Sequence, residues 1–191
     1  MRCTIHNPSL ARAKCASTSG FSVLEVAIAM VILAIAIGGL VAATTSSYTL
    51  SRSNQSRSAA HEAAREKIEE IRSADPALVF ALYNDDPNDD PAGVGTAPGS
   101  GFDVPGLSAR PDDLDGRVGR VFFPVDAGGT LREDTLLSSL DMPRDLNLDG
   151  IIDANNRAAD YALLPVGVAL DWRGPKAFGH MELHVLLMAV R

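Results

Sequence analysis

One uninterrupted apolar segment constrains the structure of this chain more than any other feature. Residues 23 to 43 read VLEVAIAMVILAIAIGGLVAA, and Glu25 is the only charged residue among them. As a helix, the 23 residues from Phe21 to Ala43 would be roughly 34 Å long. Because this length is enough to cross a hydrocarbon core of about 30 Å, the sequence predicts a transmembrane helix over residues 21–43.

The distribution of basic residues predicts the orientation of this helix. Arg2, Arg12 and Lys14 precede the apolar segment, whereas Arg52 and Arg57 are the next basic residues and lie well beyond it. Short segments rich in Lys and Arg stay in the cytoplasm. We therefore expect a single-pass protein with a cytoplasmic N-terminus and with its C-terminal part outside the membrane.

Three interpretations fit an apolar segment at this position: a plain signal anchor, a secretory signal cut after Val41-Ala42-Ala43, or a precursor that is cut before the segment. Glu25 favours the third, because an unpaired carboxylate near the start of a spanning helix costs on the order of 2–3 kcal/mol or more. Cleavage between Gly20 and Phe21 would give Phe21 a free α-amine, four residues before Glu25 and on the same helix face. In a filament, this amine could meet the Glu25 of a neighbouring subunit.

Residues 20–26, Gly-Phe-Ser-Val-Leu-Glu-Val, resemble the prepilin cleavage and methylation motif of the type IV pilin and pseudopilin family. The short basic leader, residues 1–20, and the apolar segment behind it match that family too. The resemblance implies that a membrane peptidase removes the leader after Gly20, that Phe21 becomes the N-methylated terminus and that Glu25 guides assembly.

The same resemblance implies a minor pilin or a minor pseudopilin of a type II secretion system, and a set of partners. These are the prepilin peptidase and N-methyltransferase, other pilins or pseudopilins, an inner-membrane assembly platform and membrane lipid. The implied location is the inner membrane and then the pilus or pseudopilus.

The helical pattern continues beyond the apolar segment. Residues 44–73 contain no Pro or Gly, and strong helix formers dominate their second half. Four apolar residues recur there at helical spacing and form one stripe: Ala60, Ala64, Ile68 and Ile71. Asp75-Pro76 ends the run, because a residue before proline disfavours the helical region. We expect an amphipathic helix that docks on a sheet.

The rest of the chain predicts a small antiparallel sheet. Residues 74–116 are rich in Pro, Gly and Asp and predict a loop, whereas 117–125 predict a strand. Alternation over Tyr161–Trp172 and a returning strand over Phe178–Val190 predict a hairpin, in which Pro165 marks an edge position or a strand start. The expected fold class is α+β, with a long N-terminal helix packed on an antiparallel β-sheet head over 117–191, which is the pilin architecture.

Residues 145–156, DLNLDGIIDANN, resemble an EF-hand or dockerin calcium loop. Asp145, Asn147, Asp149 and Asp153 stand at loop positions one, three, five and nine, with glycine at six; the Ile151 carbonyl and Asn156 would complete the ligands. The loop departs from the pattern at position twelve, because Asn156 is not a bidentate acid. Asp160 could substitute there, and Ile152 would pin the loop to the core. The alternative is an Asx-rich turn without metal.

Charge and motifs exclude several functions. The chain has 17 basic and 24 acidic residues, and the leader holds three of the basic ones. The remaining acidic body argues against nucleic-acid binding. We find no catalytic motif, including any triad around Ser139, and expect a protein without enzymatic activity. Cys3 and Cys15, which lie in the leader, fit no common zinc pattern.

Two further groups of polar residues were considered as cation sites, and one alternative function fits the sequence. The acidic cluster Asp85, Asp86, Asp89 and Asp90 predicts a solvated loop rather than a cation site. His180 and His184 share a strand face but lack a third ligand, so we expect surface histidines. The alternative to a filament subunit is a membrane-anchored or secreted binding or adhesion module stabilised by Ca²⁺, with an ordinary signal or anchor.

Overall fold

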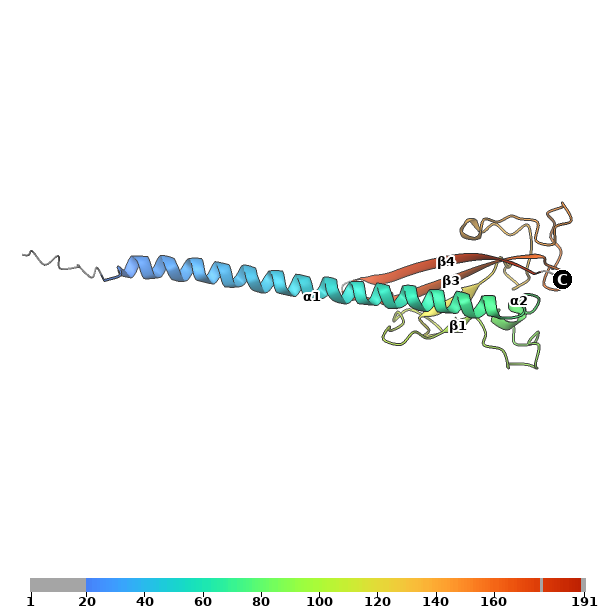
Figure 1. Cartoon of the computed structure of the whole chain (residues 1–191), viewed down its shortest axis with the longest axis horizontal. Coiled ribbons are helices and arrows are strands. Elements are labelled where there is room, and N and C mark those ends of the chain that lie inside the picture. Colours follow the sequence, from blue (N-terminus) through green and yellow to red (C-terminus); the bar gives the residue numbers. More distant parts are fainter. Residues whose placement is uncertain (1–19, 176, 190–191) are drawn as a thin grey trace, which may run out of the picture. The chain divides into compact units, whose positions relative to one another are not determined.

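The computed structural model describes residues 20–175 and 177–189 of the chain (Figure 1). The chain divides into two compact units, Met1–Thr45 and Ser46–Arg191. The long helix α1, Val23–Ser73, contributes to both units and contains 51 residues. The predicted leader, with Cys3 and Cys15, lies outside the described residues except for Gly20.

The described part of the first unit is the apolar half of α1 and the three residues before it. The Oγ atom of Ser22 accepts a hydrogen bond from the N–H of Leu24 at 3.3 Å, and the carbonyl of Ser22 accepts one from Val26 at 3.1 Å. The apolar side chains of residues 23–43 are exposed along this half. An 18-residue window of α1 has a mean hydropathy of 2.8, which makes the helix a candidate membrane span near the N-terminus and fits an anchor or a signal sequence.

In the second unit, the other half of α1 contributes to a hydrophobic core. The predicted stripe of Ala60, Ala64, Ile68 and Ile71 is buried in that core, together with side chains from β3. The helix ends at Ser73, two residues before the Asp75-Pro76 pair that predicts its end. The amphipathic character expected for this half is therefore present.

The sheet has four antiparallel strands in the order β1-β2-β3-β4. Their bounds are β1 Gly101–Phe102, β2 Gly119–Phe122, β3 Leu163–Arg173 and β4 Phe178–Met188, and a short 3-10 helix, η1, covers Ser138–Leu140. The predicted closing hairpin is present as β3 and β4, which pair without interruption from Leu163↔Met188 to Arg173↔Phe178. Leu164, Val166, Val168, Leu170 and Trp172 are all buried, as their alternation predicts.

Pro165 lies in an inner strand rather than at the sheet edge. It is the third residue of β3, whose neighbour β2 pairs only with Gly167–Leu170. Proline has no N–H to donate, and at this position β2 has already ended. The strand-start interpretation of Pro165 is therefore the correct one.

Residues 74–116 differ from the loop that their composition predicts. Helix α2, Val79–Tyr83, lies in this segment, and so does strand β1. Val79, Phe80 and Tyr83 are buried, and the ring of Phe80 meets that of Phe123 edge-on at 5.2 Å. A helix of five residues is too short to show periodicity in a sequence, so burial against the core, rather than local propensity, decides its conformation.

Three glycines allow aromatic rings to lie across the neighbouring strand. Gly119 pairs with Phe102, Gly167 with Phe122, and Gly179 with Trp172. A Cβ atom on these glycines would lie 2.3, 2.2 and 2.1 Å from the paired ring, far inside van der Waals contact. The rings therefore cover the strands only because the opposite residue has no side chain.

Candidate functional site

The residues of the predicted processing motif lie at the start of α1. Gly20 and Phe21 precede the helix and are exposed, and Glu25 is an exposed residue of the first turn. A carboxylate in the first turn is stabilised by the unpaired N–H groups and by the helix dipole. Phe21 and Glu25 are four residues apart, so a charge at the amine of Phe21 would lie near this acid.

The acidic loop, residues 145–157, folds around its own oxygen atoms. Oδ1 of Asp145 accepts a hydrogen bond from the Leu148 N–H at 2.6 Å, and its Oδ2 accepts one from Gly150 at 2.7 Å. Oδ1 of Asp149 accepts the Ile151 N–H at 2.8 Å, while Nδ2 of Asn147 donates to its Oδ2 at 2.9 Å. Gly150, at loop position six, has a φ of 86°, which suits the sharp turn that glycine permits there.

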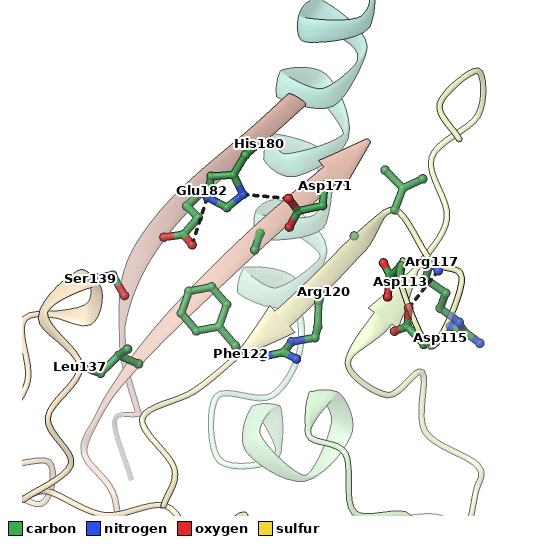
Figure 2. A pocket seen from close by; sticks show the side chains of 13 residues that line it. Asp113, Asp115, Arg117, Arg120, Phe122, Leu137, Ser139, Asp171, His180 and Glu182 are labelled. Carbon is green, nitrogen blue, oxygen red and sulfur yellow. Dashed lines mark hydrogen bonds and ion pairs between the residues drawn. The ribbon is translucent and has the colours of Figure 1, made fainter. Parts of the chain in front are cut away.

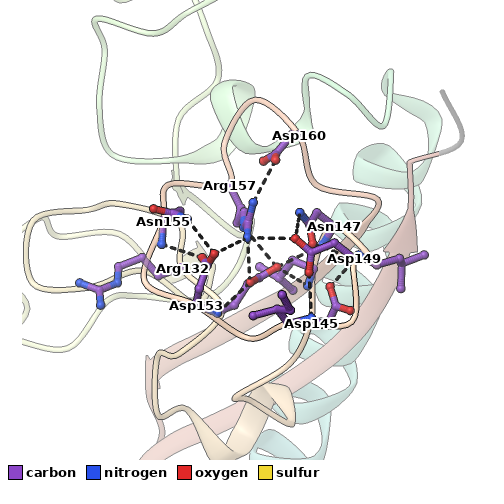
Figure 3. A network of polar contacts seen from close by, with 12 residues as sticks. Arg132, Asp145, Asn147, Asp149, Asp153, Asn155, Arg157 and Asp160 are labelled. Carbon is purple, nitrogen blue, oxygen red and sulfur yellow. Dashed lines mark hydrogen bonds and ion pairs between the residues drawn. The ribbon is translucent and has the colours of Figure 1, made fainter.

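Arg157 occupies the centre of this loop (Figure 3). Its guanidinium lies 2.9 Å from Oδ2 of Asp153, 3.6 Å from Oδ2 of Asp149 and 3.1 Å from Oδ2 of Asp160. The side chain is only 8% exposed. The hydrogen bonds from Asn147 and Ile151 and the charge of Arg157 hold the pKa of the Asp149 carboxyl below its usual value. Arg157 is thus an internal cation for the acidic loop.

Glu133 supports the loop from the segment that follows β2. It is fully buried, and its Oε1 accepts hydrogen bonds from the N–H groups of Leu146 at 2.9 Å and Asn147 at 3.3 Å. Its Oε2 accepts one from the Asp153 N–H at 3.1 Å and one from Arg157 at 3.3 Å. Neither Glu133 nor Arg157 is among the residues predicted from the sequence. The role of Glu133 depends on contacts with a distant segment, whereas Arg157 pairs locally with Asp153 and Asp160, so its spacing from them is a signal in the sequence.

Two details of the predicted calcium loop differ from expectation. Ile152 is 50% exposed and Ile151 is 64% exposed, so neither isoleucine pins the loop to the core; Leu146, which is fully buried, does so instead. Oδ1 of Asn156 accepts the Ala158 N–H at 2.9 Å, which stabilises the following turn. Asp160, the expected substitute at position twelve, pairs with Arg157.

The donor set therefore fits a hard cation only in part. Asp145, Asn147, Asp149 and Asp153 supply the oxygen atoms that Ca²⁺ prefers, but two of these carboxylates already pair with Arg157. Within residues 20–175 and 177–189, no group of three or more His, Cys, Asp or Glu side chains is arranged to hold a metal ion. A divalent ion at this loop would have to compete with the guanidinium.

The carboxylates of the second acidic cluster, Asp85, Asp86, Asp89 and Asp90, accept hydrogen bonds from their own loop. Asp89 accepts a hydrogen bond from Nδ2 of Asn84 at 2.7 Å, and Oδ1 of Asp86 accepts the Asn88 N–H at 3.0 Å. Asp90 accepts the Ala97 N–H at 3.1 Å, and Asp85 accepts the hydroxyl of Ser100. These carboxylates stabilise turns of residues 84–100.

A cavity of about 450 Å³ lies on the exposed face of the sheet. His180 lies between two carboxylates there (Figure 2), with Nδ1 3.1 Å from Oδ1 of Asp171 and Nε2 3.4 Å from Oε1 of Glu182. Ser139 lines the same cavity. Because both imidazole nitrogens of His180 face carboxylates, neither is positioned to take a proton from Ser139. His184 contacts the other oxygen of Glu182 at 3.3 Å.

Comparisons with protein-family models, with curated proteins and with solved structures return no match.

Proposed function

We propose that this chain is a minor pilin or pseudopilin, a structural subunit of a type IV pilus or of a type II secretion pseudopilus. The observation that supports this most strongly is Glu25, the only charged residue of α1 before Arg52. A spanning helix tolerates a lone carboxylate poorly. Cleavage after Gly20 would create the amine of Phe21 as its partner, in the same chain or in a neighbouring subunit.

The two halves of α1 support a role in helix packing. The half over residues 23–43 leaves its apolar side chains exposed in the single chain, so lipid or neighbouring helices must cover them. The other half buries its stripe in its own head. In the proposed assembly, subunits are first inserted in the inner membrane. The apolar halves of their α1 helices then pack around a common filament axis, and Glu25 sets the axial register between neighbouring subunits.

The proposal includes the processing and assembly partners. A prepilin peptidase and N-methyltransferase would act on Gly20 and Phe21, and an inner-membrane assembly platform would add the subunit to other pilins or pseudopilins. None of these steps requires catalysis by this chain. The second unit, Ser46–Arg191, would remain outside the membrane.

Replacing Glu25 tests the assembly role. We expect Glu25→Ala to be processed normally but to reach the sheared filament fraction at least about tenfold less than wild type. The amine of Phe21 would then lie in an apolar setting without its partner, and a cost of about 2 kcal/mol exceeds one decade in equilibrium constant. Glu62→Ala, an exposed acid on the amphipathic half, is the matched control and should assemble normally. Normal assembly of Glu25→Ala would contradict the role proposed for this carboxylate.

The acidic loop favours a second candidate, a membrane-anchored or secreted binding or adhesion module stabilised by Ca²⁺. The observation behind it is that Asn147, Asp149 and Asp153, whose side-chain oxygen atoms can ligate a cation, lie close together in the loop. Asn147 contacts Asp149, and Asp149 and Asp153 both contact the Arg157 guanidinium. For that candidate the apolar segment would be an ordinary anchor or signal. A mature N-terminus downstream of residue 40 would favour this candidate over a filament subunit.

A further inference from the structure

The two edges of the sheet differ in how they are covered. β1, at one edge, has two residues, and the guanidinium of Arg117 donates a hydrogen bond to the carbonyl of Gly101. β4, at the other edge, has 11 residues, and among the described strands it pairs with β3 alone (Figure 1). Proteins commonly protect a long edge with lysine, proline or a bulge. Phe178–Met188 contains no lysine or proline and pairs with β3 without a bulge, so β4 is an open edge.

The hydrogen-bond pattern shows which groups of β4 face the open edge. The N–H of Gly174 donates to the Ala177 carbonyl at 3.1 Å, and the N–H of Ala189 donates to the Ala162 carbonyl at 2.8 Å. These two pairs flank the uninterrupted register of β3 and β4, and in an antiparallel pair the bonded residues recur at every second position. Odd-numbered residues of β4 therefore bond to β3. The even-numbered residues of Phe178–Met188 direct their N–H and C=O groups away from the sheet.

The side of β4 that faces the core is only partly covered. Its apolar side chains are partly buried, whereas the residues opposite them on β3 are fully buried. The partly buried residues are Met181, Leu183, Val185 and Leu187, and the residues opposite them are Leu170, Val168, Val166 and Leu164. A further strand beside β4 would cover this apolar row in the way that β4 covers β3, which removes apolar surface from water.

Glu182 determines one side chain of such a strand. It lies next to the middle of β4, on the face away from the core, and its backbone groups face the open edge. Among the described residues, its carboxylate pairs with the imidazoles of His180 (Figure 2) and His184, at 3.4 and 3.3 Å, and with no lysine or arginine. An imidazole carries charge only when it is protonated. Because opposite charges at facing positions of paired strands attract, a basic residue on the added strand would complement Glu182.

A second copy of β4 does not fit this edge within one membrane. The hairpin tip lies beside Ser46–Arg57 of α1, since both line a cavity of about 220 Å³. The start of β3 lies beside the end of α1, where the hydroxyl of Tyr161 donates to the Pro76 carbonyl at 2.6 Å. β4 therefore runs in the same direction as α1. An antiparallel copy would turn its own α1 in the opposite direction, whereas the proposed function gives all α1 helices of one membrane the same direction.

We propose that the open edge of β4 is a binding site for an extended segment of another protein, which joins the sheet as an additional antiparallel strand. The segment carries a lysine or arginine opposite Glu182 and an apolar residue on either side of it, opposite Met181 and Leu183. Main-chain hydrogen bonds to the even-numbered residues of β4 supply affinity, and the alternating side chains supply specificity. Only the exclusion of a second copy rests on the proposed function.

A synthetic peptide tests the site in the full chain, reconstituted in phosphatidylcholine nanodiscs. The peptide Thr-Val-Thr-Val-Lys-Val-Thr-Val-Thr carries a fluorophore, and fluorescence anisotropy measures its binding. With the lysine opposite Glu182, the N–H groups of the threonines and the lysine face β4, and those of the valines face solvent. We expect N-methylation of the lysine backbone nitrogen to weaken binding about tenfold or more. N-methylation of the adjacent valine gives a peptide of the same composition and should leave binding nearly unchanged.

Variants of two residues test the protein side of the contact. His184→Pro removes one N–H of the open edge, and proline is tolerated on an edge strand where the N–H faces solvent. This variant should bind the peptide at least about fivefold more weakly than His184→Thr, which keeps the N–H. Glu182→Gln should weaken binding of the lysine peptide about two- to fivefold, and should not weaken binding of a peptide with norleucine in place of lysine. The fluorescence of the buried Trp172 shows whether each variant is folded.

Three results would overturn the proposal. Equal affinities for the two N-methylated peptides would show that the peptide binds without adding a strand, and no measurable binding of the parent peptide would remove the site. A disulfide dimer of Leu183→Cys, with Cys3 and Cys15 replaced by serine, would place a second copy on the edge, because antiparallel pairing of the whole of β4 puts Leu183 opposite itself. None of these results bears on cleavage after Gly20, so the site and the proposed function can fail separately.

Discussion

Arg157 and Glu133 form a buried ion pair between segments that are 24 residues apart, with 3.3 Å from Nε of Arg157 to Oε1 of Glu133. The pair ties the acidic loop to the segment after β2. Both side chains are almost completely removed from solvent. Removing one charge from such a pair leaves the other without a partner in a poorly solvating environment, which is far costlier than losing an exposed pair.

Neutralising Glu133 should therefore destabilise the head. We expect Glu133→Gln to cost roughly 3 kcal/mol or more, which lowers the unfolding midpoint by about 6 °C or more in a domain of this size. The fluorescence of Trp172, the single tryptophan and a buried core residue, follows the transition. Asp134→Asn, which removes the partially exposed acid that pairs with Arg132, is the neighbouring control and should leave the midpoint close to that of wild type. Equal midpoints for the two variants would refute the role assigned to Glu133.

Competition between Arg157 and a cation gives the calcium proposal a specific signature. If Ca²⁺ binds the acidic loop, millimolar Ca²⁺ should raise the unfolding midpoint of wild type. Asp149→Asn should weaken the effect, whereas Arg157→Gln should enlarge it, because the guanidinium no longer occupies Asp149 and Asp153. Mg²⁺ at the same concentration serves as the control. Unchanged midpoints in both wild type and Arg157→Gln would remove calcium from the account.

The contact between Gly167 and Phe122 predicts a steric effect. A Cβ atom at residue 167 would lie 2.2 Å from Cζ of Phe122, so Gly167→Ala must displace the ring and should cost about 1–3 kcal/mol. Phe122→Leu in the same background should recover part of this loss, which a double-mutant cycle of unfolding free energies measures. Strictly additive effects would show that the two positions do not restrict each other.

The elements that the sequence predicts well are those with a long and regular pattern. The length of α1, the stripe from Ala60 to Ile71 and the β3–β4 hairpin all follow from periodicity over ten residues or more. The composition of residues 74–116 indicated a loop, but α2 and β1 have five and two residues. Segments this short are fixed by what they touch in the core, and local sequence carries little of that information.

The candidate sites show the same limit. The spacing in the acidic loop marks Asp145, Asn147 and Asp149 as neighbours. In the structure Asn147 donates a hydrogen bond to Asp149, and Asp145 accepts hydrogen bonds from the N–H groups of Leu148 and Gly150. No spacing could indicate that Glu133 enters the same cluster, because it reaches the loop through the fold. Arg157 directly follows the predicted loop, and its spacing of four residues from Asp153 and three from Asp160 is a local signal that could have indicated its role. The motif at Gly20, Phe21 and Glu25 is different, because its meaning depends on processing and on neighbouring subunits rather than on contacts within one chain.

The mass of the intact mature protein, isolated from membranes of cells that also make a prepilin peptidase and N-methyltransferase, tests the central claim most directly. The account predicts a chain that begins at Phe21, lacks residues 1–20 and carries one additional methyl group. A protein that still begins at Met1, or that has lost everything up to residue 40 or beyond, would contradict the filament-subunit function.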